Sequence, residues 1–388
     1  MELQKHILPL AVIFQKDESF VKNKMHEICP YTAMFPPRLA NLLIQNFTDA
    51  DAEIYDPFSG RGTTLLQARI LGRRCYASDL NPLSYVLSKS KSQNVLFRVI
   101  ENRLKELESE YHDCSDIKYE LDDYEYMKTY YSLNVYKQLI FIKNKLGKKW
   151  KENDNTDNFI LSLLLGIMHG PTRKNGTSMF LSIQMSNTTV MSKKYVDKYV
   201  NIHNLKFPTN ENLFEKILYK ALKSLKNENK YVKAVFKIGN ALECNTIFKN
   251  KKFDLILTSP PYLNVFNYTK ENWIRLWMLG FDRQTCSREI KLDDNHKYQE
   301  YKRFLINFLN SATKSLKQTG RLVLIIGDVE GKYCFKQLWS EIKSYTNLYL
   351  MDSYQDKNAS FKSTRKNGTR AGHATRIDNI CVFKRIKQ

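Results

Sequence analysis

The chain has 388 residues, and 43% of them are hydrophobic, which is enough for one large domain carrying an insertion or for two domains. No apolar run approaches the roughly 20 residues that cross a membrane, and the seven dispersed cysteines include no Cys-x-x-Cys pair. We therefore predict no membrane span, no metal site and a reducing, cytoplasmic environment.

The chain is strongly basic, with 61 lysine and arginine residues against 40 aspartate and glutamate residues and a formal net charge of +21. A solvated, lysine-rich surface is one explanation for this excess. A polyanionic partner, most often nucleic acid, is the other. Charge alone does not separate DNA from RNA, or either of them from an anionic membrane surface, so the choice of partner depends on the motifs.

A helix followed by a compact βαβ unit is predicted near the start of the chain. Pro37 suits a first helical turn, where a missing N–H costs nothing, and the leucines that follow give the helix one apolar face. Asp79 stands at the carboxyl end of the second strand of the unit. The predicted elements of the unit are a strand over 53–56, a glycine turn over 57–62, a helix over 63–71 and a strand over 74–78.

The middle of the chain, from about residue 90 to 230, has a different character. It is rich in lysine, tyrosine, asparagine and leucine, with helical patterns over 158–168 and 212–225 and a polar loop over 170–176. We interpret residues 91–231 as a largely helical insertion between the second and third strands.

Strands and helices alternate again from residue 233 onward. The predicted strands cover 233–238, 253–257, 321–326, 348–353 and 379–384, and the predicted helices cover 273–279, 298–316 and 335–344. Together with the first unit they predict an α/β fold with a seven-stranded, mostly parallel sheet and helices on both faces, built from residues 1–90 and 232–388. A basic loop over 362–376, without a helix, joins the last two strands, which predicts an antiparallel strand closing the edge of the sheet.

The glycine turn of the first unit is a candidate ligand site. Gly60 and Gly62 let the backbone approach a ligand at the carboxyl ends of the strands, and the Asp79 carboxylate can accept both hydroxyls of a ribose. Position 65 is Leu65, so the Gly-x-Gly-x-x-Gly dinucleotide fingerprint is absent. The pattern fits an adenosine ligand that carries no pyrophosphate. Asn240, after the third strand, either contacts the adenine edge or belongs to an ordinary Gly-Asn turn.

Two adjacent prolines follow the apolar strand over 253–257. Pro260 and Pro261 fix φ and remove two backbone donors, so the Ser259 hydroxyl and the Pro260 carbonyl form a rigid set of acceptors. Such acceptors can hold the hydrogens of an amino group that is conjugated to a ring, and can aim its lone pair at an electrophile. Tyr262 adds an aromatic face for stacking a planar ring. We interpret residues 259–262 as a corner that activates the amine of a flipped base.

The two motifs together, Phe58 to Gly62 and Thr258 to Tyr262, resemble those of the amino-methylating DNA methyltransferases that use S-adenosylmethionine. The resemblance covers roughly the first 90 residues and everything from about Lys233 onward. A serine before the prolines is similar to the cytosine-N4 type, whereas adenine-N6 enzymes usually carry Asp or Asn there. The family often has an acidic residue where Asn240 stands, and the long insertion is unusual for it.

The resemblance implies a Rossmann-like methyltransferase fold, S-adenosylmethionine as cofactor, double-stranded DNA as partner and a cognate restriction endonuclease as a further partner. The implied catalytic residues are Ser259, Pro260, Pro261 and Tyr262. The implied cofactor contacts are Phe35, Pro36, Asp56, Phe58, Gly60, Gly62, Thr63, Thr64, Asp79, Asn81, Asn240 and Ala241. Substrate contacts are expected from Asn264, Phe266 and Tyr268, and phosphate contacts from Arg173, Lys174, Arg365 and Arg370.

The predicted reaction is a direct displacement at a base rotated out of the duplex, without a cysteine nucleophile, in which positioning supplies most of the catalysis. The helical insertion is the expected target-recognition region. Three alternatives stay open at this point. They are methylation of adenine N6, methylation of RNA, and a relic of the fold that binds nucleic acid without catalysis.

Overall fold

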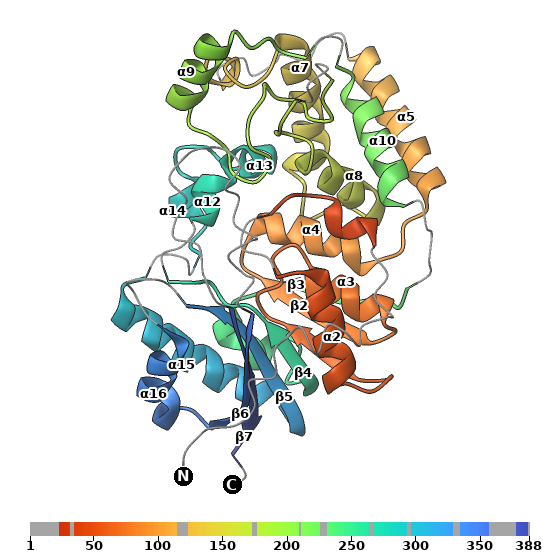
Figure 1. Ribbon diagram of the computed structural model, residues 1–388. Helices are drawn as coiled ribbons and strands as arrows, with labels where there is room; N and C mark the ends of the chain where they lie inside the picture. Colours follow the sequence, from red (N-terminus) through yellow and green to blue (C-terminus); the bar gives the residue numbers. More distant parts are fainter. Residues whose placement is uncertain are drawn as a thin grey trace.

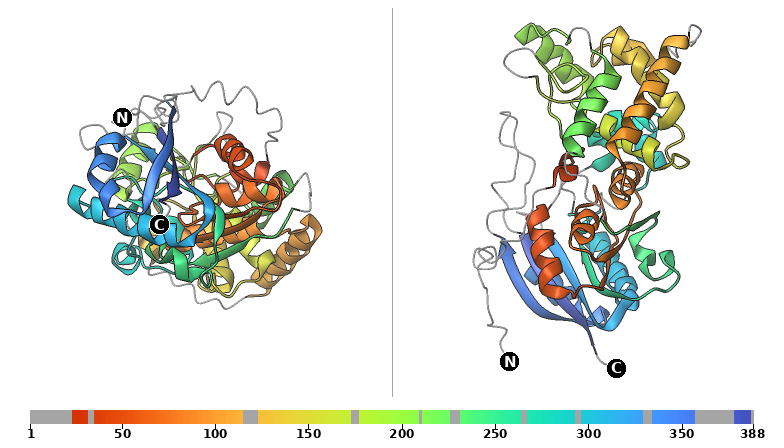
Figure 2. Two further views of the ribbon diagram at one scale, coloured as in Figure 1. Left: turned by 90° about the horizontal axis from the view of Figure 1, so that it is seen from below. Right: turned by 90° about the vertical axis from the view of Figure 1, so that its right-hand side faces the viewer.

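The computed structural model describes residues 23–31, 35–114, 123–172, 177–208, 211–225, 231–263, 267–292, 296–328, 334–356 and 378–386. The described chain forms two regions stacked along the long axis of the molecule (Figures 1 and 2). One is a sheet flanked by helices, which we call the sheet region. The other is a group of helices beyond one end of the sheet, which we call the helical layer.

The sheet has seven strands in the order β3-β2-β1-β4-β5-β7-β6. The five strands from β3 to β5 are parallel, and β7 runs antiparallel to both of its neighbours. This arrangement confirms the predicted seven-stranded, mostly parallel sheet. The strands are β1 (Glu53–Asp56), β2 (Arg74–Asp79), β3 (Val235–Ile238), β4 (Phe253–Thr258), β5 (Leu316–Gly327), β6 (Leu348–Asp356) and β7 (Asp378–Arg385).

The place of the antiparallel strand corrects one prediction. The sequence pattern suggested that it closes the edge of the sheet, but β7 lies between β5 and β6, and β6 is the edge strand. Burial agrees with this order: Ile380 to Phe383 is a continuous apolar run buried on both faces, as is typical of a strand inside a sheet rather than at its edge. Over residues 348–355 of β6, whose burial is described, Leu348 alone is buried, so that strand tolerates the edge.

Helices cover both faces of the sheet, as predicted. On one face, α2 (Pro37–Phe47) and α3 (Thr63–Ile70) pack against side chains such as Leu255 and Leu257 of β4. On the other face, α15 (Tyr298–Ser315) and α16 (Phe335–Ile342) pack against side chains that include Ile256. Alternate residues of β4 therefore point into two different cores, which is the pattern of a strand buried on both sides.

The helical layer is built mainly from the chain between β2 and β3. Its core is continuous with α4 (Pro82–Ser92), which lies beside β2 and β3 and so links the layer to the sheet. The elements of the layer are α5 (Phe97–Asp113), α6 (Tyr124–Met127), α7 (Leu133–Ile142) with a π-helical turn (Lys143–Gly147), α8 (Asn155–Leu165), α9 (Lys193–His203) and α10 (Leu213–Ser224). The described helices are all too short or too polar to span a lipid bilayer.

A second stretch of chain also enters the helical layer, which the sequence pattern did not indicate. The segment after β4 forms α12 (Tyr268–Glu271), α13 (Trp273–Met278) and α14 (Cys286–Glu289), and the apolar side chains of α13 belong to the core of the layer. Arg275 of α13 is completely buried and donates to the Leu165 carbonyl at 3.0 Å and the Asn187 carbonyl at 2.7 Å. This guanidinium therefore joins the two stretches of chain.

Candidate active site

The candidate active site is a pocket at the carboxyl ends of the four neighbouring parallel strands β1 to β4. Its walls come from the loops after those strands, where ligands bind in open α/β sheets. It contains about 600 Å³ of space not filled by protein atoms, a figure that includes open solvent at its mouth. The lining residues are Tyr31, Pro57, Phe58, Gly60, Asp79, Leu80, Asn81, Gly239, Ala241, Ser259, Pro261, Tyr268 and Leu292.

The glycine turn between β1 and α3 adopts a conformation that needs glycine at two positions. Gly60 has φ +52° and Gly62 has φ +78°, both in the left-handed region. A Cβ on Gly62 would lie 3.0 Å from Ser88 Oγ and 3.3 Å from the Ser88 Cα, because α4 packs directly against the turn. The Ser88 hydroxyl donates to the Gly60 carbonyl at 3.1 Å. The turn is therefore held in one shape from below by α4.

Asp79 is the last residue of β2 and lies directly beside the glycine turn. Its carboxylate accepts the Gly60 N–H at 2.8 Å on one oxygen and the Asn81 N–H at 2.9 Å on the other. Burial raises the pKa of Asp79 to about 6, although these backbone donors partly offset the effect. Since each carboxylate oxygen has two acceptor sites, both can still receive a hydroxyl hydrogen from a ribose.

Asp56 ends β1, but it lies beneath the pocket and does not line it. Its Oδ1 accepts the Thr258 hydroxyl at 2.7 Å and the Phe58 N–H at 3.2 Å. Burial raises the pKa of Asp56 to about 7. In the structure Asp56 acts as a brace that ties the glycine turn after β1 to the proline corner after β4.

The proline corner contributes Ser259 and Pro261 to the pocket wall, opposite Gly60 and Asp79. The Ser259 hydroxyl donates to the Tyr262 hydroxyl at 3.4 Å. Tyr301 of α15 donates its hydroxyl to the Pro261 carbonyl at 2.9 Å, so a buried side chain holds the corner from behind. Pro260 is buried, and the half-buried Tyr262 ring packs against the core shared with α15. Neither of these two residues lines the pocket.

Several other predicted cofactor residues lie away from the pocket walls. Asn240 caps the short helix η4 (Ala241–Glu243) by accepting the Leu242 N–H at 2.9 Å. Phe35 packs against the core on the α2 face of the sheet, and Pro36 precedes the first turn of α2. Thr63 and Thr64, two further predicted cofactor residues, are buried in the first turn of α3. Gly62 is the N-cap of this helix.

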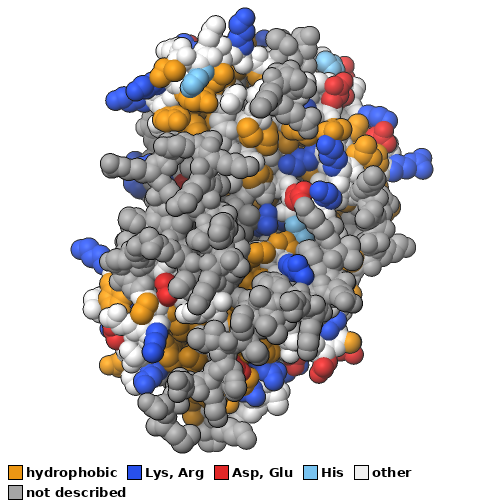
Figure 3. All heavy atoms as spheres, in the orientation of Figure 1, with side chains coloured by type: hydrophobic (Ala, Val, Ile, Leu, Met, Phe, Trp, Pro, Cys, Tyr) orange, Lys and Arg blue, Asp and Glu red, His pale blue; other side chains and the backbone are white. Residues whose placement is uncertain are grey.

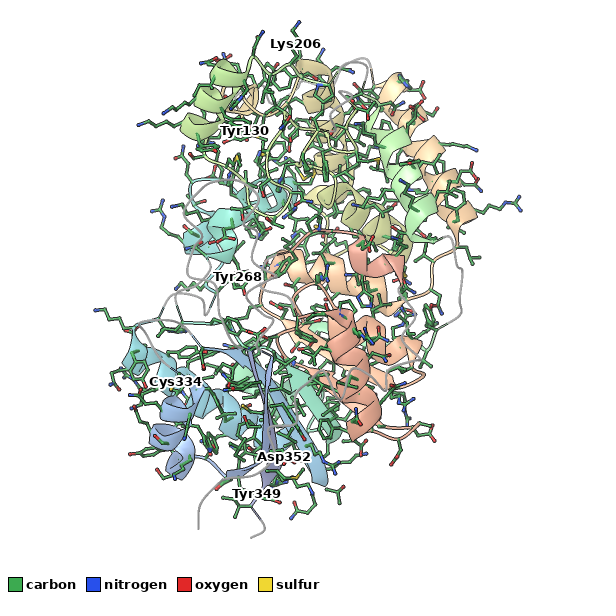
Figure 4. The ribbon with its side chains drawn as sticks, viewed as in Figure 1. Tyr130, Lys206, Tyr268, Cys334, Tyr349 and Asp352 are labelled. Carbon is green, nitrogen blue, oxygen red and sulfur yellow. The ribbon has the colours of Figure 1, made fainter. Side chains whose placement is uncertain are left out.

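The predicted substrate residues divide into described and undescribed positions. Tyr268, the first residue of α12, lines the pocket between the sheet region and the helical layer (Figure 4). Its ring stacks on Tyr31 with centroids 6.0 Å apart and an angle of 25° between the rings. The positions that lie outside the described residues are Asn264, Phe266, Arg173, Lys174, Arg365 and Arg370.

Tyr31 is the main pocket residue that sequence reasoning missed. Its hydroxyl lies 3.2 Å from Ser84 Oγ and accepts a hydrogen bond from Asn81 Nδ2 at 3.3 Å, which holds the ring beside Gly60. An aromatic residue just before the Phe35-Pro36-Pro37 segment was the available signal. Leu292 and Tyr301 gave no comparable signal, because long-range packing alone brings them to the site.

The strand order, with the pocket over β1 to β4, defines a Rossmann-like methyltransferase fold. A family described as DNA methylase matches residues 9–90 and 253–383, which is more than half of the chain. The chain therefore belongs to this DNA methylase family, and the resemblance to amino-methylating DNA methyltransferases is confirmed.

Three curated relatives are distant. The type II methyltransferase M.MvaI of Kocuria varians is 26% identical over 62% of this chain and 54% of its own length, so the chain spans about half of that relative. M.BsoBI of Geobacillus stearothermophilus is 24% identical over 90% of this chain and 73% of its own length. M.MjaII of Methanocaldococcus jannaschii is 21% identical over 85% and 76%, respectively.

Solved structures also match, but their structural similarity to this chain is too low to support a conclusion about fold or function. TrmN from Thermus thermophilus has a TM-score of 0.35 and 12% identity over 93% of this chain and 52% of its own. The rRNA methyltransferase aviRa from Streptomyces viridochromogenes has a TM-score of 0.33 and 9% identity, over 92% and 87%. The fold assignment rests on the strand order instead.

Membership in the family implies S-adenosylmethionine as the methyl donor. The residues of the pocket fit this group. Asp79 offers acceptor sites for ribose hydroxyls, Gly60 allows a close approach of the backbone, and Phe58 and Leu80 give apolar walls. No phosphate-binding arrangement is needed for a sulfonium nucleoside.

Proposed function

We propose that the chain methylates the N4 amino group of a cytosine that is rotated out of double-stranded DNA. One observation supports the proposal above all: Ser259 and Pro261 of the proline corner line the same pocket as Gly60 and Asp79 of the glycine turn. The amine-holding and nucleoside-holding residues thus face a shared space. S-adenosylmethionine, when bound there, supplies an electrophilic methyl group.

The residues of the corner would position the amine. Ser259 Oγ would accept an amino hydrogen and help to direct the nitrogen lone pair toward the donor side of the pocket, whereas Pro260, whose carbonyl the sequence suggested as a second acceptor, does not line the pocket. Tyr301 holds the Pro261 carbonyl, so the corner is rigid before the base arrives. Tyr268 and Tyr31 offer a stacked aromatic wall against which a planar base can rest. The proton that the amine loses on methylation would pass to solvent.

Cytosine N4 is proposed over adenine N6 because a serine stands before the prolines, as in the cytosine-N4 type. We further propose that the helical layer selects the target sequence and that the chain works in a restriction–modification system beside an endonuclease. The type II methyltransferases among the relatives are consistent with this placement.

The test is to incubate the purified protein with labelled S-adenosylmethionine and DNA, and then to digest the DNA to nucleosides. We expect label in N4-methylcytosine. Label only in N6-methyladenine would overturn the base assignment, and label only in RNA would overturn the substrate class. Sequencing of modified bases in a bacterial host that expresses the gene would show the sequence context of the methylated base.

A further inference from the structure

Helix α9 (Lys193–His203) of the helical layer has one anchored side and one exposed side. Val196 is its only buried residue. Thr129 donates its hydroxyl to Asp197 at 3.0 Å, and Lys193 donates to Asp197 at 2.9 Å and to the Thr129 hydroxyl at 2.6 Å. These bonds fix the orientation of the helix, so the opposite side is presented to solvent in one defined arrangement.

The exposed side carries a column of rings. Tyr195, Tyr199 and His203 are spaced four residues apart, which places them on one face of a helix. The two tyrosine rings stack with centroids 6.0 Å apart and an angle of 13°, and His203 lies 4.3 Å from the Tyr199 ring. Ile202 beside them is 64% exposed. Exposed apolar and aromatic surface that is ordered in this way usually meets a partner.

The same side is cationic. Lys194 and Lys198 are exposed on α9, and Lys206, three residues beyond the helix, lies at the top of the molecule (Figure 4). Asp197 is the only acidic residue between positions 190 and 208, and Lys193 already pairs with it at 2.9 Å. Figure 3 shows the result at the upper left, where hydrophobic side chains over α9 are bordered by blue ones.

The helix is also connected directly to the pocket wall. Just before α9, the Val190 N–H donates to the Glu271 carbonyl at 3.0 Å, and the Thr189 hydroxyl lies 3.4 Å from the Glu271 carboxylate. Glu271 ends α12, and Tyr268 at the start of α12 lines the pocket. The segment before α9 is therefore tied to α12, while α9 itself lies toward the far end of the helical layer (Figure 1).

We propose that the exposed face of α9, formed by Lys194, Tyr195, Lys198, Tyr199, Ile202 and His203, is a DNA-contacting surface. The proposal rests on the proposed function. Lys194 and Lys198 would neutralise phosphates, and the rings would pack against the sugars and base edges beside them. Charge complementarity favours a polyanion over a protein partner, because the face has no unpaired acid to attract basic residues.

The test compares two double variants of the full chain that change charge equally. One is Lys194→Gln with Lys198→Gln. The control is Lys105→Gln with Lys223→Gln, two exposed lysines on α5 and α10, which lie on the opposite side of the helical layer from α9 (Figure 1). DNA affinity is measured by fluorescence anisotropy over a series of salt concentrations, and S-adenosylhomocysteine affinity by calorimetry.

For the α9 variant we expect the slope of log affinity against log salt to become shallower by about 1.8, or about 0.9 for each lost phosphate contact. The control should keep the wild-type slope, and both variants should bind S-adenosylhomocysteine normally. Equal slopes for the two variants would overturn the proposal and favour a protein partner for this face. If the slopes were equal but the wild-type protein still methylated cytosine N4, the proposal for α9 would fail while the proposed function would hold. The failure of one proposal can therefore be told apart from the failure of the other.

Discussion

The glycine turn and the proline corner follow neighbouring strands, β1 and β4, yet they achieve rigidity by opposite means. The turn uses positive φ at Gly60 and Gly62, which directs a backbone N–H to the Asp79 carboxylate. The corner uses fixed φ at Pro260 and Pro261, which removes N–H donors and leaves carbonyl acceptors. One side of the pocket is thus organised around a carboxylate and the other around acceptors for an amine. Glycines that present an N–H and prolines that remove one can therefore give the two sides of one pocket different binding roles.

The largest expected effect is a loss of methylation rate in a variant of the proline corner that still binds the cofactor normally. Ser259→Ala should lower the single-turnover rate of methylation by about 100-fold, because a mispositioned reacting group typically loses that much. Affinity for S-adenosylhomocysteine should not change. Ser340→Ala, at an exposed serine of α16, is the matched control. A rate within threefold of the wild type would refute the assignment of Ser259 to the amine.

The next effect tests the turn. Gly62→Ala should destabilise the fold by about 1–3 kcal/mol through left-handed strain and should also weaken cofactor binding, since a Cβ would press on Ser88 at 3.0 Å. Gly72→Ala is the control, because Gly72 has φ +77° but no atom within 4 Å of its Cβ position. Urea unfolding and calorimetry measure both quantities. If Gly62→Ala and Gly72→Ala had the same stability and the same cofactor affinity, the contact between position 62 and α4 would affect neither quantity.

A smaller effect concerns the brace between the two motifs. Thr258→Val removes the hydroxyl that Asp56 accepts at 2.7 Å, which should cost about 1–3 kcal/mol of stability at pH 8. Burial places the pKa of Asp56 at about 7 in the folded chain, above its ordinary value of 3.8, so Asp56 contributes stability at low pH that is lost as pH rises through 7.

Losing the Thr258 donor should raise the pKa of Asp56 further. The variant should therefore lose less stability at pH 5 than at pH 8, as judged by urea unfolding at both values. A loss that does not depend on pH would show that Asp56 is not the group that senses the hydroxyl. Asp56→Asn in the wild-type background should remove the decline in stability as pH rises through 7.

The smallest expected effect is the pH dependence of cofactor binding. The pKa of Asp79 is raised to about 6 by burial, and the ionised form accepts ribose hydroxyls better than the protonated form. Affinity for S-adenosylhomocysteine should therefore fall as pH drops through 6, by about tenfold at pH 5 if only the ionised form binds. Asp79→Asn should bind weakly and without this pH dependence. A wild-type affinity that stays flat from pH 5 to pH 8 would contradict the role of Asp79.

The sequence by itself determined the α/β fold, the two motifs and the family. These features are local: strand and helix periods, glycines in a turn and prolines after a strand depend on nearby residues and on backbone chemistry. For the same reason, the sequence alone indicated Gly60, Asp79, Ser259 and Pro261, which line one pocket in the structure.

Only the tertiary structure decided the features that depend on contacts across long stretches of chain. It placed β7 inside the sheet, brought Tyr31 and Leu292 to the pocket, and joined α13 to the helical layer through Arg275. It also gave Asp56 a partner in Thr258, 202 positions away. Residue types and their spacing do not predict such pairings, because the burial of distant segments and the hydrogen bonds between them form only when the whole core packs.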